Sequence, residues 1–138
     1  EKLKKVSHMP SFGKKSLEKL GELHPKLQQV LIEAIKHVDF SIYEGHRSSA
    51  LQQLYLDTGK SKAKPGQSKH NKFPSEAADL WSYPIDWEQT EQQCYIAGVI
   101  LGIASQMGIN VRWGYDWDRD GDTRDNKFND MPHFEVLL

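Results

Sequence analysis

Four residues with metal-binding or proton-transferring side chains stand out in this sequence. His70 lies in a polar stretch, Asp79 in an apolar run, and His133 near the C-terminal end, three residues after Asp130. A catalytic zinc site uses three protein ligands of these types and leaves a fourth position for water, whose pKa the metal lowers to about 7. The residue types therefore indicate a metal hydrolase with His70, Asp79 and His133 as ligands.

Asp79 is the strongest of these signals, because it interrupts the apolar run Ala77-Ala78-Asp79-Leu80-Trp81, which is typical of a buried strand. A buried carboxylate is costly unless it is paired or bound to a metal. Alone, however, Asp79 could be a capping or ion-paired residue, and His70 an ordinary loop histidine. The residues by themselves leave the metal and non-metal interpretations open.

Two acids flank His133 in the sequence. Asp130 could sit beside the metal without binding it, take a proton from the attacking water and pass it to the leaving amine; the alternative is a turn residue within 129–132. Glu135 shares a strand face with His133, because alternate residues of a strand point the same way. It could be a fourth ligand, but four protein ligands would close the site, so we expect Glu135 to accept a hydrogen bond from an imidazole.

Arg47 follows a predicted strand and precedes a predicted helix, so its guanidinium could reach over a sheet edge. There it would polarise a scissile carbonyl and stabilise the oxyanion. The alternative is a surface ion pair with Glu44. The remaining histidines after residue 8, His24, His37 and His46, have no comparable neighbours in the sequence and are expected at the surface or in packing contacts.

A run of alternating acids follows Tyr115, with Gly121 where a calcium loop turns sharply. The run is not an EF-hand, because its twelfth position is Lys127 and not a bidentate Glu. Calcium, another divalent ion and a solvated hairpin without an ion are all open alternatives. Trp113, Tyr115 and Trp117 are expected to wall a cleft, with at least one of them in the core. The acids concerned are Asp116, Asp118, Asp120 and Asp122.

Hydrophobic spacing predicts four helices and four strands that would position these side chains. Ser16 and either Ser48 or Ser49 are expected N-caps, and Pro25 opens the second helix. Residues 60–75 have two prolines, a glycine and no periodicity, which predicts a long loop. The predicted helices cover 16–23, 25–37, 49–59 and 88–107, and the strands 40–43, 77–81, 109–113 and 133–137.

A chain of 138 residues fits one domain, and these elements predict an α+β fold with a small, mostly antiparallel sheet flanked by helices. In the third helix, Leu51, Leu54 and Tyr55 are the expected buried stripe. The fourth helix, which contains Cys94 and stops at Gly108, is expected to be the central core helix, with Cys94 inside the core.

Composition excludes several classes of partner. Lys plus Arg number 18 against 19 Asp plus Glu, a net charge of −1, so no basic field favours nucleic acid or an anionic membrane. The single cysteine rules out an intramolecular disulfide. The longest apolar run, 94–104, is too short to span a bilayer, and no signal peptide is recognised. We expect a soluble monomer, with residues 1–8 as a cloning-derived leader and 9–138 as one domain.

Four blocks of the sequence together resemble the VanY-type zinc peptidases, which include D-alanyl-D-alanine carboxypeptidases and the L-alanyl-D-glutamate endopeptidase endolysins of tailed phages. The blocks stand in family order: Gly45-His46-Arg47-Ser48 followed by Gln52 and Gln53; Ser68-Lys69-His70 leading to Ala77-Ala78-Asp79; residues 113–118; and Asp130-Met131-Pro132-His133-Phe134-Glu135. One departure is that eight residues, 71–78, separate His70 from Asp79, where the family usually has six. This predicts a two-residue insertion and makes Glu76 a competing ligand candidate.

The resemblance implies a fold like that of DD-peptidases and hedgehog domains. It also implies zinc on His70, Asp79 and His133, Asp130 as general base and Arg47 as electrostatic stabiliser. The residues expected near the substrate are Ser68, Gln52, Gln53 and Tyr115.

The activity implied is cleavage of the L-alanyl-D-glutamate bond in peptidoglycan stem peptides. The enzyme would be a phage endolysin made in the host cytoplasm and released to the wall by a separate protein that permeabilises the membrane. One alternative is a D-alanyl-D-alanine carboxypeptidase, in which Lys69 or Lys72 would bind the terminal carboxylate. Another is a non-catalytic, zinc-stabilised binding module, but such a module would need neither Asp130 nor Arg47.

Overall fold

A computed structural model describes residues 10–125 and 128–138 of the chain. The expected leader, 1–8, and the Lys127 position of the acidic run lie outside these residues. The α+β prediction is confirmed. In chain order the elements are α2 (Lys14–Leu20), α3 (Pro25–Ala34), β1 (Ser41–Glu44), α4 (Ser49–Asp57), the 3-10 helix η1 (Lys69–Asn71), β2 (Ala77–Trp81), α5 (Thr90–Met107), β3 (Val111–Trp113) and β4 (His133–Val136).

The four strands form one sheet in the order β1-β2-β4-β3, and every neighbouring pair is antiparallel. Side chains alternate between its two faces. One face carries Leu80, Phe134 and Val136 into the hydrophobic core. The opposite face, which we name the site face, carries Asp79 and His133.

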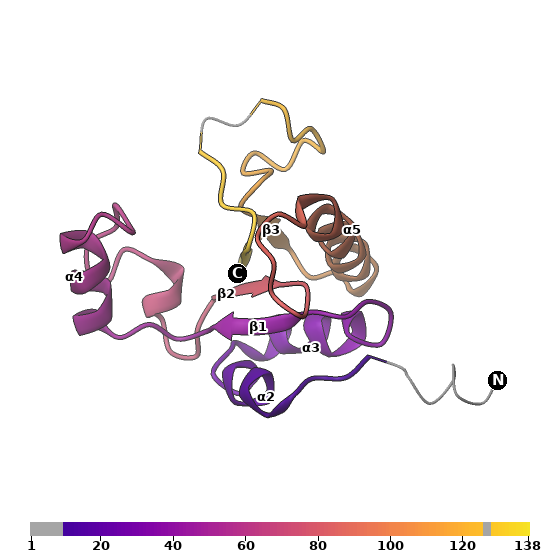
Figure 1. The fold of residues 1–138 in the computed structure, drawn as a ribbon, viewed down its shortest axis with the longest axis horizontal. Helices are drawn as coiled ribbons and strands as arrows, with labels where there is room; N and C mark the ends of the chain where they lie inside the picture. The colour runs from indigo at the N-terminus through magenta and orange to yellow at the C-terminus, as the bar shows by residue number, and fades with distance from the viewer. Residues whose placement is uncertain (1–9, 126–127) are drawn as a thin grey trace, which may run out of the picture.

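The helices α3 and α5 cover the core face of the sheet, and α2 lies along the edge strand β1 (Figure 1). In α3, Leu27, Val30 and Leu31 are completely buried, as the helical spacing predicts. In α5, Ile96 and Ile100 are buried on the same core. Gly108 ends α5 in the left-handed conformation, with φ of 69°, which glycine adopts without strain.

Two predictions about single residues are wrong. Ser16 is not an N-cap: α2 starts two residues earlier, and the buried Ser16 hydroxyl accepts a 3.0 Å hydrogen bond from the backbone N–H of Ile42. Ser16 thereby satisfies one of the groups that an edge strand leaves unpaired. Cys94 is exposed, because α5 turns its Gln93 and Ile96 side toward the core. The helix therefore borders the core with one face and is not central to it.

The third predicted helix is present, but it buries a different side from the one expected. Ser48 is its N-cap, as expected, and accepts a 3.1 Å hydrogen bond from the N–H of Leu51. The predicted apolar stripe is wrong: Leu54 is 53% exposed, and the one buried residue of α4 is Gln52. In Figure 1, α4 and η1 accordingly stand to the left of the sheet, apart from the layered helices.

Among the described residues, no helix combines the length and the hydropathy needed to cross a membrane.

Candidate active site

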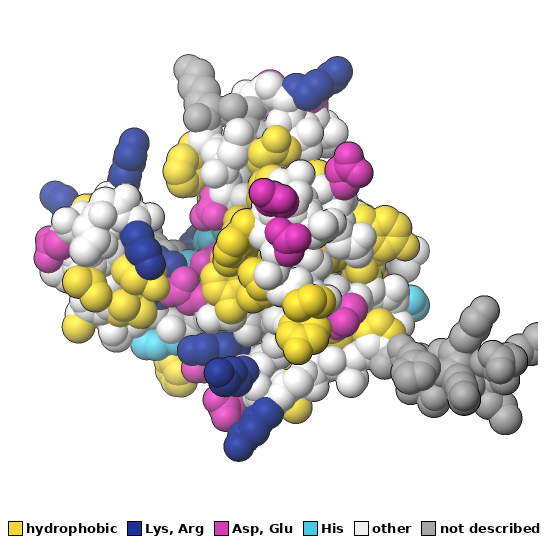
Figure 2. All heavy atoms as spheres, viewed as in Figure 1, with side chains coloured by type: hydrophobic (Ala, Val, Ile, Leu, Met, Phe, Trp, Pro, Cys, Tyr) yellow, Lys and Arg dark blue, Asp and Glu magenta, His cyan; other side chains and the backbone are white. Residues whose placement is uncertain are grey.

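The site face brings three potential metal ligands together. Asp79 on β2 and His133 on β4 are direct partners in the strand register. His70 comes from η1, where the Ser68 hydroxyl caps the turn by accepting a hydrogen bond from the His70 N–H. All three residues are buried, and their ligand atoms lie within 4.8 Å of one another. Figure 2 shows histidine and acidic side chains in the recess between the α4 region and the rest of the surface.

Both imidazoles are oriented by an acceptor behind them. Nδ1 of His70 lies 2.8 Å from the carbonyl oxygen of Gly45, and Nε2 of His133 lies 2.8 Å from Oε1 of Glu135. When each of these nitrogens donates its proton, the other nitrogen of the ring carries the free lone pair. A partner that fixes the tautomer in this way is a recurrent feature of histidine metal ligands.

The spacing of the free ring nitrogens fits a tetrahedral metal. Nε2 of His70 and Nδ1 of His133 lie 3.3 Å and 3.4 Å from the same oxygen, Oδ1 of Asp79. Ligand atoms about 2.0 to 2.1 Å from a tetrahedral zinc ion lie about 3.3 Å from one another. Two imidazole nitrogens and one carboxylate oxygen are also the donor set of a catalytic site with three protein ligands.

The charges of the cluster are strongly coupled. Burial disfavours the charged form of Asp79, but hydrogen bonds to His133 and His70 outweigh burial and hold the pKa of Asp79 far below its usual range. Burial also disfavours protonated His133, yet Asp79 and Glu135 raise the pKa of His133 to about 9. The two carboxylates therefore favour the protonated form of His133.

Asp130 approaches the cluster from the turn before β4. Burial, followed by the charge of Asp79, raises the pKa of the Asp130 carboxyl above its usual value. The Asp130 backbone is fixed by Gly114, whose carbonyl accepts a 2.8 Å hydrogen bond from the Asp130 N–H. A Cβ at position 114 would overlap the carbonyl oxygen of Asp130, so only glycine fits there. The sequence signal for this contact was the Trp113-Gly114 pair, whose role we did not predict.

Arg47 lies next to the cluster and is 7% exposed. Its Nε donates a 2.8 Å hydrogen bond to Glu44, its Nη1 donates one of 2.8 Å to Gln52, and its Nη2 lies 3.9 Å from Oδ2 of Asp79. The ring of Tyr55 lies 4.7 Å from the guanidinium carbon. Burial disfavours the charge of Arg47, but Glu44 outweighs it and raises the Arg47 pKa. Arg47 therefore does form the ion pair with Glu44 that the alternative interpretation expected, but the pair is largely buried and does not lie at the surface.

Comparison with known proteins supports one family. The model of the phage L-alanyl-D-glutamate peptidase family matches residues 9–137. The chain belongs to this family. The L-alanyl-D-glutamate peptidase of Escherichia phage T5 is 32% identical over 120 residues, which are 83% of this chain and 86% of that protein. The crystal structure of the Serratia marcescens L-Ala D-Glu endopeptidase ChiX matches 93% of this chain and 91% of its own, with a TM-score of 0.74 and 29% identity.

These findings confirm the family resemblance and the fold class expected from the sequence. In this member of the phage L-alanyl-D-glutamate peptidase family, the long segment between His70 and Asp79 contributes no residue to the ligand cluster. Ser75 is buried and exchanges backbone hydrogen bonds of 2.8 Å with the loop between α2 and α3. Glu76 lies 3.4 Å from Nζ of Lys69 and is not among the clustered ligands.

The residues expected near the substrate occupy different positions in this peptidase. Gln52 is fully buried behind Arg47, while Gln53 is exposed on α4 and bonds Asp57. Ser68 is half-buried beside His70, and Tyr115 packs on Trp113 with ring centroids 5.3 Å apart. A ligand can contact Ser68, Tyr115 and Gln53 directly, because these side chains are at least partly exposed. Gln52 is shielded from solvent.

Aromatic rings border the cluster on two sides. The centroid of the Trp117 ring lies 5.4 Å from that of the His133 ring. The guanidinium carbon of Arg112 lies over the Trp117 ring, also 5.4 Å from its centroid. Across the site, Tyr43 contacts Trp87 with centroids 5.5 Å apart. Burial, and then the charges of Asp79 and Asp130, raise the pKa of Tyr43, so its hydroxyl stays protonated. We did not predict Tyr43 from the sequence, because nothing in its local pattern marks it.

The acidic run forms a second cluster of carboxylates. Oxygens of Asp116, Asp118 and Asp120 lie within 4.8 Å of one another, and Asp122 is not part of this group. Oδ1 of Asp116 is buried and has no hydrogen-bond partner among the described residues. Burial raises the pKa of Asp116, and a hydrogen bond with Asp120 raises the pKa of Asp125 to about 6. The carboxylates of this run therefore lie close to others of the same charge.

Proposed function

We propose that this protein is a zinc-dependent endopeptidase that hydrolyses the L-alanyl-D-glutamate amide bond in the stem peptides of bacterial peptidoglycan. One observation carries the proposal. In a chain of this family, two imidazole nitrogens lie 3.3 Å and 3.4 Å from one Asp79 oxygen, and the turn that leads into His133 supplies a further carboxylate, Asp130, whose backbone carbonyl accepts a 3.1 Å hydrogen bond from the His133 N–H. A metal site that only stabilised the fold would have no use for the additional carboxylate.

A zinc ion bound by His70, Asp79 and His133 would supply a Lewis acid and lower the pKa of a water molecule. The protein residues divide the remaining work. Asp130, whose raised pKa makes it a better proton acceptor, takes a proton from the attacking water and gives it to the leaving amine. Arg47 contributes a fixed positive charge that stabilises the oxyanion as it develops.

Glu135 supports this chemistry indirectly. It accepts the His133 proton at 2.8 Å and is itself held by Arg112 at 2.8 Å. Burial raises the pKa of Glu135, but His133 and Arg112 outweigh burial and lower it. Glu135 therefore stays ionised and keeps the lone pair of His133 directed at the metal position. It acts behind the ligand and is not a fourth ligand.

The biological setting that we propose is phage endolysis. The enzyme would be made in the host cytoplasm, reach the cell wall when the membrane is permeabilised, and act there as a monomer. Light scattering, which measures the mass of the protein in solution, tests whether it is a monomer. Calcium binding by Asp116, Asp118 and Asp120 is a further proposal, supported by the partnerless Asp116 oxygen.

The decisive experiment is mass spectrometry of purified muropeptides after incubation with the protein, with and without a zinc chelator. We expect chelator-sensitive products cut between L-alanine and D-glutamate. Loss of only a terminal D-alanine would identify a carboxypeptidase instead. Absence of any cleavage by a folded, zinc-loaded sample would favour the non-catalytic binding module.

A further inference from the structure

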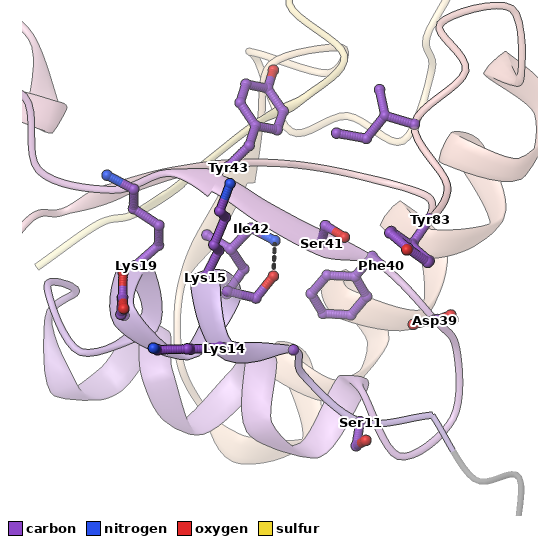
Figure 3. A pocket seen from close by; sticks show the side chains of 14 residues that line it. Ser11, Lys14, Lys15, Lys19, Asp39, Phe40, Ser41, Ile42, Tyr43 and Tyr83 are labelled. Carbon is purple, nitrogen blue, oxygen red and sulfur yellow. Dashed lines mark hydrogen bonds between the residues drawn. The ribbon is translucent and has the colours of Figure 1, made fainter.

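A groove lies along the edge strand β1, between α2 and the loop after β2 (Figure 3). Its volume is about 880 Å³, and no step of the proposed hydrolysis uses it. One wall is the lysine-bearing side of α2, and the other includes Tyr83 and Ile85. The floor is formed by residues 39–43, which enter and form β1.

The groove is continuous with the candidate active site through Tyr43. This side chain lines the end of the groove, and its ring contacts Trp87 on the site face. Tyr43 directly precedes Glu44, which is the register partner of the metal-ligand candidate Asp79, so the Tyr43 end of the groove lies beside the strand position of the candidate site. A substrate bound at the metal ligands would therefore enter the groove beside Tyr43.

The groove is lined by three lysines, Lys14, Lys15 and Lys19, and by two acids, Glu18 and Asp39, so positive charge is in excess by one. In Figure 3, Lys15 and Lys19 extend toward the Tyr43 end, whereas Asp39 lies at the opposite end. Lys19 forms an ion pair with Glu22 at 3.9 Å, and Glu18 lines the same wall of the groove. Lys15 makes no ion pair with any residue that the structure describes, so its ammonium group can pair with a ligand.

The size and lining of the groove also fit a short extended peptide. Five residues, 39–43, span about 16 Å at roughly 3.3 Å per residue. Tyr83 and Ile85 are 67% and 43% exposed, which leaves apolar surface available to side chains of such a peptide. The N–H of Ile42 is already bonded to Ser16, so the ligand would be recognised by side chains and not as an added strand.

We propose that this groove is a subsite for the part of the stem peptide that follows the scissile bond. Lys15 and Lys19 pair with its free carboxylates, and Tyr83 and Ile85 contact its aliphatic portions. The inference rests on the proposed function, because it assigns a second segment of the same substrate. It implies that the enzyme distinguishes long stem peptides from short ones.

The test compares two muropeptides, one ending at D-glutamate and one carrying a four-residue stem peptide. The quantity measured is the ratio of kcat/KM for the longer substrate to kcat/KM for the shorter one. For the unchanged enzyme we expect a ratio well above one. In Lys15→Glu the ratio should fall about fivefold, mainly through KM, because a favourable ion pair becomes a repulsion. Raising the salt concentration should reduce this difference.

Lys26→Glu on α3 is the matched control, since it changes the net charge equally at an exposed position outside the groove. It should leave the ratio unchanged, and Lys15→Arg should preserve it. If Lys15→Glu cleaves both substrates and its kcat/KM ratio equals that of the unchanged enzyme, the groove assignment alone is overturned. The assignment is also overturned if kcat/KM depends on the length of the glycan and not on the length of the peptide. If the unchanged enzyme cleaves neither substrate, the proposed function fails first and the subsite with it.

Discussion

The completely buried amide oxygen of Gln52 accepts a 2.8 Å hydrogen bond from Nη1 of Arg47. The amide nitrogen of Gln52 is also used, because it donates hydrogen bonds to the Ser61 hydroxyl and to the carbonyl oxygen of Ala63. Gln52 therefore connects the guanidinium to the long loop after α4. Its neighbour Gln53 lies on the exposed side of the same helix.

Gln52→Met should lower kcat by about tenfold or more, because a buried hydrogen bond to a charged group contributes roughly 1.5 to 3 kcal/mol and its loss frees Arg47 to move. Steady-state kinetics and thermal unfolding measure the two effects. Gln92→Met, at an exposed position of α5, should change neither. Full activity in Gln52→Met would refute the positioning role.

Asp130→Asn and His133→Ala should separate chemistry from metal binding. We expect Asp130→Asn to keep its zinc and to lose turnover by about 100-fold or more, since an amide cannot accept the proton. His133→Ala should lose zinc and activity together. Elemental analysis of each purified variant, combined with kcat, provides the readout. An Asp130→Asn enzyme that retains full activity would contradict the proposed mechanism.

Gly114→Ala should destabilise the protein by about 2 kcal/mol and reduce activity, because the added methyl group overlaps the Asp130 carbonyl. Chemical denaturation and kcat measure the change. Gly102→Ala in α5 is the control: nothing lies within 4 Å of its Cβ position, so it should be neutral or stabilising by up to about 1 kcal/mol. Equal behaviour of the two variants would argue against a specific contact at position 114.

The metal-free protein should lose stability as the pH rises from about 6.5 to 9. The folded-state pKa of His133 is raised to about 9 by Asp79 and Glu135, above the 6.5 of the unfolded chain. The stabilisation is therefore fully present below pH 6.5 and is lost as the pH rises through 9; it amounts to roughly 3 kcal/mol. Thermal unfolding with a chelator follows this change. A flat profile over that range, or an unchanged one in His133→Gln, would contradict it.

Calcium should stabilise the protein through the acidic run. At 100 times the dissociation constant, a ligand of the native state adds about 2.7 kcal/mol to the free energy of unfolding. Asp116→Asn should abolish this gain, and Asp39→Asn, at an exposed acid elsewhere, should not. Calorimetry of the zinc-loaded protein with calcium or magnesium is the measurement. Identical unfolding temperatures with and without calcium would exclude the site.

Some of these features were predictable from local sequence and others were not. Asp79 was predictable as a buried acid because the apolar residues around it define a strand. Residue type suggested the grouping of His70 with Asp79 and His133, and the family resemblance strengthened it, since the three lie on separate elements and no local pattern brings them together. The burial of Gln52 was not predictable, because α4 packs by a polar contact with Arg47 and helical periodicity reports only apolar packing.

The cluster of His70, Asp79 and His133 joins two parts of the molecule that otherwise share little apolar contact. His70 belongs to the α4 and η1 part, whereas Asp79 and His133 belong to the sheet and its hydrophobic core. A bound metal therefore acts as a crosslink between a weakly packed segment and a strongly packed one. Removing it should accelerate amide hydrogen exchange in α4 and η1 while α3 and α5 keep their protection.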